Sequence, residues 1–247
     1  MDAAVGRRLR VGLGAAIREF VREPINLVLL VALPPLMITS YGSMMSAFPK
    51  MPYMSTDPGT MGSMAGTLFV AAFLPGVIGL FQVISARRAD DRLALAGFPR
   101  PVLFLSRLLA MTVASLLTAG MALSVLATRT DVAAPVAGFV TLVFVGTLYG
   151  LLGMLIGAVL PRELEGSLVL IFLADMDEAM ASGVVRTDSP VTKLFPLHYP
   201  HDLFRAAVEG TPAAPGDALA TGIYAVTLLI CTLAAYTTLT GEGGVGG

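Results

Sequence analysis

Long apolar runs separated by short polar stretches dominate the chain. Five runs, each with at most one charged residue, cover residues 25–47, 61–85, 102–128, 133–160 and 216–239. Each is long enough to cross a bilayer as a helix, which takes roughly 20 apolar residues. A further run, 166–185, is interrupted by Asp175, Asp177 and Glu178. The pattern predicts an all-α integral membrane protein with six transmembrane helices, organised as a single transmembrane domain over residues 1–247.

Composition supports the membrane assignment and excludes several other classes. Hydrophobic residues make up 55% of the chain and charged residues 13%, and the mean hydropathy is +0.80. Soluble domains average roughly 25% charged residues. The runs leave no stretch long enough for a soluble domain with its own catalytic core. Cys231 is the single cysteine, so a disulfide within the chain is excluded.

Three segments outside the runs predict something other than a spanning helix. On a helix, Leu9, Leu13, Ala16, Ile17 and Phe20 form one apolar stripe between residues 6 and 23, with arginines facing away. That arrangement predicts an amphipathic interfacial helix within residues 1–24; the alternative is a solvated basic arm. Segment 186–215 carries five prolines among apolar patches, which favours short interfacial or re-entrant helices. The glycine-rich tail 241–247 is expected to be disordered.

The distribution of positive charge over the loops predicts the orientation. Of the sixteen Lys and Arg residues, five fall on one side of the predicted bundle, which leaves eleven on the side of the termini. The five are Lys50, Arg129, Arg186, Lys193 and Arg205. Loops rich in Lys and Arg stay in the cytoplasm, so both termini are expected to be cytoplasmic.

The most charged stretch, residues 85–101, falls between the second and third runs. It contains Arg87, Arg88, Asp90, Asp91, Arg92 and Arg100. Charges at this density are too costly for the lipid interior, so the stretch is expected to leave the membrane. Its inner part predicts a brief helix that ends at Gly97, with Pro99 and Pro101 beyond it. We interpret it as a cytoplasmic docking element; the alternative is a charged turn that only sets topology.

Two sets of residues inside the runs are candidates for packing and for function. Gly146, Gly150, Gly153 and Gly157 recur on one helical face and predict a close-packed seam within the bundle or between protomers. Asp175 and Glu178 share a helical face, and Asp177 points elsewhere. Acidic residues at this depth mark a pathway for a substrate or an ion, which makes Asp175 and Glu178 candidate substrate-path residues.

The order of elements resembles the permease subunit of an ABC-2-type transporter. Three patterns carry the resemblance: Arg88–Leu109, with its charged loop, apolar tip and proline; Ser182-Gly183 with Pro190; and Leu194–Ala207, rich in proline and aromatic residues. The family's inner loop more usually contains Glu and a Gly-Thr-Leu-Glu-like run, which Ala89–Ala94 only approximates. The acidic residues of the interrupted run also exceed what the family leads one to expect.

The resemblance implies partners and roles for residues. It implies a separate ABC ATPase subunit, a second permease protomer in a homo- or heterodimer, and a location in the plasma membrane. It implies ATPase coupling through Arg88, Asp91, Arg92, Leu93, Leu95 and Phe98. It also implies export of an amphiphilic, lipid-like or drug-like solute.

Other chemistry is weakly supported by the sequence. No phosphate loop of the form Gly-x4-Gly-Lys-Ser/Thr occurs, so any ATP hydrolysis is expected in another chain. His198, His201 and Asp202 suggest a metal cluster, but Pro200 is expected to break the helix that would align the histidines. Two signatures of membrane hydrolases, Gly-x-Ser-x-Gly and His-Glu-x-x-His, do not occur. We therefore expect no enzymatic activity, cofactor, metal or nucleic-acid partner.

The alternative to an ABC permease is a stand-alone transporter. It would couple transport to protons or cations through Asp175, Asp177 and Glu178. Inverted repeats would favour this alternative, and the two halves, 25–128 and 133–239, show none.

Overall fold

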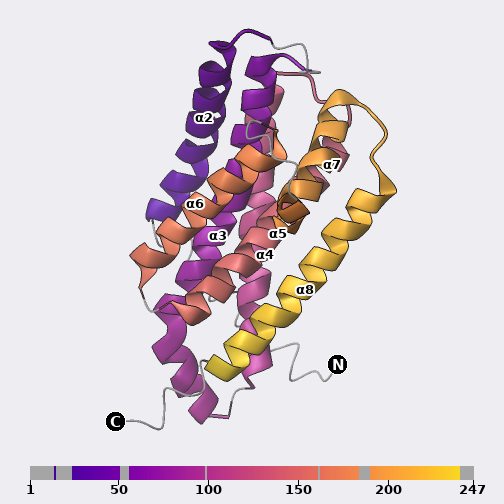
Figure 1. The fold of residues 1–247 in the computed structure, drawn as a ribbon. Coiled ribbons are helices and arrows are strands. Elements are labelled where there is room, and N and C mark those ends of the chain that lie inside the picture. The colour runs from indigo at the N-terminus through magenta and orange to yellow at the C-terminus, as the bar shows by residue number, and fades with distance from the viewer. Residues whose placement is uncertain are drawn as a thin grey trace.

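The computed structural model describes residues 14, 24–50, 56–97, 99–160, 162–183 and 190–239, and these residues contain helices and no strand (Figure 1). The helices are α2 (Pro24–Ser46), α3 (Pro58–Leu95), α4 (Arg100–Ala127), α5 (Pro135–Val159), α6 (Glu163–Ala181), the 3-10 helix η1 (Pro190–Leu194), α7 (His198–Glu209) and α8 (Pro215–Leu239). The predicted all-α architecture is confirmed for this part of the chain. The expected N-terminal interfacial helix and the tail lie outside it, apart from residue 14.

Five of these helices, α2, α3, α4, α5 and α8, are long and apolar enough to cross a membrane. Each overlaps one of the five long apolar runs, and α3 extends beyond its run. Prolines begin α2, α3, α5 and α8, where the first turn has no intrahelical partner for an amide hydrogen and proline's fixed φ suits the helix. The hydrophobic pattern therefore located these helices correctly.

The interrupted run forms α6, a helix of 19 residues that continues without a break past its acidic residues. It is inclined across α3 (Figure 1). Glu163 and Glu165 occupy its first turn, and three more carboxylates lie toward its end. With this charge α6 does not match the five spans in apolar character. A sixth crossing therefore stays a prediction.

Helix α3 is longer than its apolar run predicted. It has 38 residues and extends through the charged stretch as far as Leu95. The expected separate helix is therefore wrong in one respect, because the charged residues prolong a spanning helix and do not begin a new one. Gly97 has a φ of +86° just beyond the end, which glycine adopts without steric cost. The expected stop at Gly97 is confirmed.

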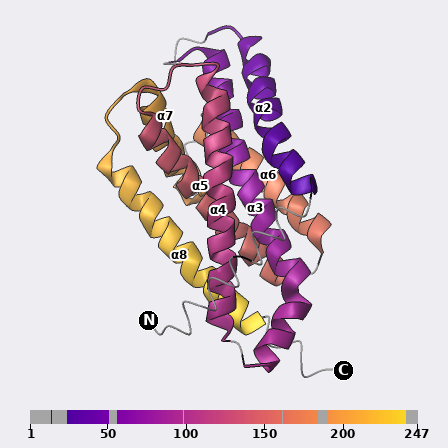
Figure 2. The ribbon, with the colours of Figure 1, turned by 180° about the vertical axis from the view of Figure 1, so that it is seen from behind.

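The centre of the bundle is α3, which packs against α2, α4, α5 and α6. In contrast, α2 and α8 lie on opposite sides of the bundle (Figures 1 and 2). The glycines of α5 line its contact with α3 and α4. A Cβ at Gly153 would overlap the carbonyl oxygen of Gly76 in α3, and one at Gly150 would overlap Met111 in α4. The seam thus packs helices within this chain.

The proline-rich segment contains two short helices among its described residues, η1 and α7, as expected. Helix α7 packs on α5 and α8, and the amide of Ala134 donates to the carbonyl of Ala207 at 2.9 Å. The expected break at Pro200 is wrong. Pro200 lies in the first turn of α7, where a proline removes no intrahelical hydrogen bond. His198 and His201 therefore do share one helix.

Candidate functional site

At one end of the bundle, a buried ion pair joins the charged end of α3 to α4. Arg107 donates to both carboxylate oxygens of Asp90, from Nη2 to Oδ1 at 2.6 Å and from Nε to Oδ2 at 3.0 Å. Its third donor, Nη1, reaches the carbonyl of Gln82 at 2.8 Å. Two parallel hydrogen bonds between a guanidinium and a carboxylate fix both side chains in orientation as well as in position.

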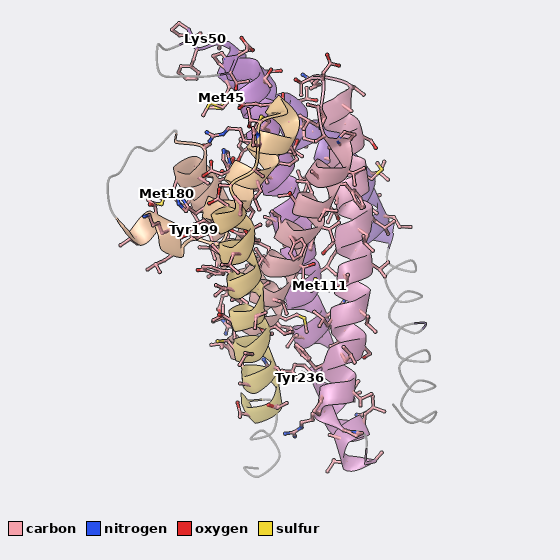
Figure 3. The ribbon with its side chains drawn as sticks, turned by 90° about the vertical axis from the view of Figure 1, so that its right-hand side faces the viewer. Met45, Lys50, Met111, Met180, Tyr199 and Tyr236 are labelled. Carbon is pink, nitrogen blue, oxygen red and sulfur yellow. The ribbon has the colours of Figure 1, made fainter. Side chains whose placement is uncertain are left out.

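Tyr236 extends this ion pair to α8. Its hydroxyl donates to Oδ2 of Asp90, and its ring packs against Phe104 of α4. Figure 3 shows Tyr236 near one end of α8, with Lys50 at the opposite end of the bundle. Asp90 therefore collects contacts from α4 and α8, which makes the end of α3 part of a three-helix joint. We call Asp90, Arg107 and Tyr236 the inner joint.

Two further arginines of the charged stretch contact helix ends. Arg87 donates from Nη2 to the carbonyls of Gly157 and Ala158, at 2.7 and 3.2 Å, where the last turn of α5 lacks partners within the helix. Arg100 donates to the carbonyl of Thr237 in α8 at 3.1 Å. The stretch is thus attached to the ends of α5 and α8 as well as to α4.

Beyond the inner joint, α3 ends in an exposed apolar tip. Leu95 is 90% exposed and Leu93 is 39% exposed. Arg92 is also exposed. The side chains of Arg88 and Asp91, and all of Phe98, lie outside the described residues. Of the expected coupling residues that are described, Arg92, Leu93 and Leu95 all reach the surface.

Away from the inner joint, Asp177 of α6 is fully buried between α5 and the segment before α7. The hydroxyl of Tyr149 donates to its Oδ2, and the backbone amide of Leu197 donates to the same oxygen at 2.9 Å. The other carboxylate oxygen is buried and has no hydrogen-bond partner in the described part of the chain. Asp177 therefore joins three segments through one oxygen atom.

Glu178, next in sequence, faces α7. Its Oε1 lies 3.3 Å from Nδ1 of His201, and both side chains are almost completely buried. The separation is within reach of an ion pair, and neither carboxylate oxygen has a hydrogen bond of good geometry with a described residue. Burial alone would lower the pKa of His201, but the Glu178 carboxylate beside it outweighs that effect and raises the pKa. Asp202, in contrast, pairs with Arg205 at 3.0 Å.

Asp175 points to a third partner, on α2. Its Oδ1 accepts a hydrogen bond of 2.6 Å from the hydroxyl of Tyr41, and its side chain is exposed. Both residues border a groove of about 390 Å³ whose other lining residues are Leu33, Met37, Phe69, Phe73, Ile171 and Phe172. Asp175 and Glu178 are near in space, as expected from their spacing, yet Asp175 alone lines the groove.

The sequence indicated the acidic residues but not their partners. Arg107 contributed to the charge count and to the pattern Arg88–Leu109 but was given no partner, although an arginine about 10 Å inside an apolar helix needs a nearby acid. Tyr41, Tyr149 and Tyr236 each lie within an apolar run, and their hydroxyls need polar partners when buried. A tyrosine within an apolar run is therefore expected to hydrogen-bond to a polar group, but the sequence does not identify which group.

The sequence matches no model of a known protein family, and no curated protein matches it either.

Proposed function

We propose that this chain is the membrane-spanning permease subunit of an ABC-2-type exporter. ATP is hydrolysed by a separate ATPase subunit, and the solute moved outward is amphiphilic. The proposed subunit has six spans, with α6 as the fifth, lies in the plasma membrane and has both termini in the cytoplasm. It works as a dimer, with itself or with a related permease.

The observation that carries this proposal is the tip of α3. Leu95 is almost fully exposed, while Asp90, about one and a half turns earlier, is buried in the inner joint with Arg107 and Tyr236. An exposed leucine on a rigid, charged helix end is suited to inserting into a groove on a soluble partner. Because the same helix continues through the centre of the bundle, a push on the tip would reach α4 and α8 through the inner joint.

Purification of the intact chain from its own membranes in a mild, neutral detergent tests the proposal. We expect two permease subunits to leave the membrane with two copies of an ABC ATPase, and native mass spectrometry to give that stoichiometry. Vesicles that contain the complex should accumulate an amphiphile only with ATP. Monomers without an ATPase, together with transport indifferent to ATP, would contradict it.

A second candidate function rests on a different observation. Asp177, Glu178 and His201 are buried side by side with several polar atoms that have no hydrogen-bond partner among the described residues. Buried ionisable groups of this kind carry protons in ion-coupled transporters. If the chain is a stand-alone proton-coupled carrier, a pH gradient alone will drive transport, and Glu178→Gln will abolish it. ATP-driven transport that survives Glu178→Gln would exclude this candidate.

A further inference from the structure

The groove between α2, α3 and α6 combines an apolar wall with a single charged group. Leu33, Met37, Phe69 and Phe73 contribute to the wall from α2 and α3, and Phe172 closes it from α6. Asp175 is the charged residue of the lining, and Tyr41 donates to one of its two oxygens. The other oxygen keeps its capacity to accept hydrogen bonds.

Asp175 has no cation partner in the described part of the chain. The ion pairs there involve Asp90, Glu165, Glu178 and Asp202. A carboxylate that borders an apolar surface within a membrane is costly unless a positive charge or water accompanies it. No described arginine or lysine pairs with Asp175, and a cationic ligand in the groove would supply that charge.

The position of Asp175 along the bundle fits the polar head of an amphiphile. Its partner Tyr41 is about 7.5 Å from the end of α2 at Ser46, given about 1.5 Å of rise per residue. The groove continues from Tyr41 to Leu33, about 12 Å deeper along the same helix. A head at Asp175 would therefore lie near the membrane surface, while an aliphatic chain follows the apolar wall inward.

We propose that this groove binds a single-chain amphiphile with a protonated amine head, whose ammonium group pairs with Asp175 and whose chain lies against Phe69, Phe73 and Phe172. Two other occupants compete with it: an ordinary phospholipid and a second copy of this chain. Charge complementarity favours the cation, because a two-fold partner would bring a second Asp175 to the same face. The proposal rests on the proposed export function and adds the class of solute to it.

The chain contains no tryptophan, which gives a fluorescence assay without background. Phe172→Trp places a reporter in the groove, and Phe144→Trp places one on an exposed position of α5 that does not line it. The full chain in neutral maltoside detergent is titrated with 12-bromododecylammonium, whose bromine quenches nearby indole. We expect saturable quenching with Phe172→Trp and only a weak, non-saturating decrease with Phe144→Trp.

Charge variants then test the role of Asp175. In the Phe172→Trp background, Asp175→Asn keeps the shape of the side chain and should weaken binding at least about tenfold, as expected for loss of a charged hydrogen bond. Tyr41→Phe should weaken it a few-fold. The control Asp217→Asn removes the same charge from the first turn of α8, on the opposite side of the bundle, and should leave binding unchanged.

Several results would overturn the proposal. Equal quenching of both reporters would mean that the probe only partitions into the micelle. Equal binding of bromododecanol or bromododecanoate would remove the role of charge, and equal binding of brominated phosphatidylcholine would assign the groove to bilayer lipid. Quenching that appears only when native mass spectrometry shows dissociated dimers would assign it to a second copy. None of these measurements involves ATP, so their failure is distinct from the absence of an ATPase partner.

Discussion

Asp90 and Arg107 lie 17 residues apart on consecutive helices, and their side chains meet in a two-point ion pair with 2.6 Å between Oδ1 and Nη2. The pair is mostly shielded from solvent, with side-chain exposures of 8% and 15%. It lies where the charged end of α3 leaves the bundle. The helix end that our proposal assigns to a soluble partner is therefore a fixed extension of the bundle.

Breaking this pair from one side should destabilise the protein strongly. Asp90→Asn or Arg107→Gln leaves an unmatched charge in a shielded place, and loss of one partner of a buried pair costs about 3–5 kcal/mol. The double variant should lose less than the sum of the single losses. Thermal unfolding of the purified chain in detergent measures these values.

The matched control for that experiment is Arg162→Gln. Arg162 pairs with Glu165 at 3.0 Å, but the side chains are 77% and 47% exposed, so its loss should cost under about 1 kcal/mol. Additive losses at Asp90 and Arg107, or losses no larger than that of Arg162→Gln, would show that the inner joint does not hold α3 to α4.

A second prediction concerns the close approach of the α3 and α5 backbones at Gly76 and Gly153. Gly153→Ala places a methyl group on the carbonyl oxygen of Gly76, which belongs to a central helix and cannot move aside cheaply. We expect severe loss of folded protein, measured as the monodisperse fraction in size-exclusion chromatography. Gly222→Ala in α8 meets nothing within 4 Å and should be neutral or stabilising, by up to about 1 kcal/mol. Equal behaviour of the two variants would contradict the seam.

The hydrophobic pattern was sufficient for the helices but not for their pairing. An apolar run of twenty or more residues has essentially one solution in a membrane, so α2, α4, α5 and α8 begin and end within two residues of expectation. The secondary structure of the charged stretch, residues 85–101, was harder to predict. The same residues suit a separate short helix or a continuation of the span, and the pairing of Asp90 with Arg107, which accompanies the continuous helix, is not visible in the pattern.

The candidate site residues follow from one principle: a charged side chain within a membrane span is costly and therefore marks a functional or ion-paired position. This principle selected Asp175, Asp177 and Glu178, and their spacing separated Asp177 from the other two. It did not distinguish Asp175, which lines an open groove, from Glu178, which is buried against His201. That difference depends on where α2 and α7 cross α6, which no periodicity in α6 encodes.

The pair of Glu178 and His201 predicts a pH dependence of stability. Because the Glu178 carboxylate raises the pKa of His201 above that of a free imidazole, the protonated histidine contributes stability that is fully present below about pH 6.5. That contribution is lost as the pH rises through the raised pKa. The unfolding midpoint should therefore fall as the pH is raised above about 6.5, the ordinary value for a free imidazole.

Histidine variants separate this effect from general alkaline destabilisation. His201→Gln should lower the midpoint at acidic pH and flatten its dependence on pH. The chain has two histidines, and His198→Gln is the matched control, because His198 is not part of the pair with Glu178. This change should leave the pH dependence intact. A pH profile unchanged by His201→Gln would mean that the ion pair does not titrate in this range.

The last prediction concerns Leu95, the most exposed large apolar side chain of the α3 tip, at 90% exposure. If the tip inserts into an ATPase subunit, Leu95→Asp places a charge in an apolar groove and should cost about 2 kcal/mol or more of binding free energy, equivalent to a loss of affinity of more than about tenfold. Folding should be unaffected, because the side chain contacts solvent and the inner joint remains intact. Leu95→Met keeps an apolar tip of similar volume and should behave like the wild type.

The measurement compares the ATPase retained on the purified permease, ATP hydrolysis and vesicle transport for the three proteins. Normal unfolding midpoints together with lost transport in Leu95→Asp alone would support coupling through the tip. Full transport by Leu95→Asp would reduce the charged stretch to a signal for membrane topology.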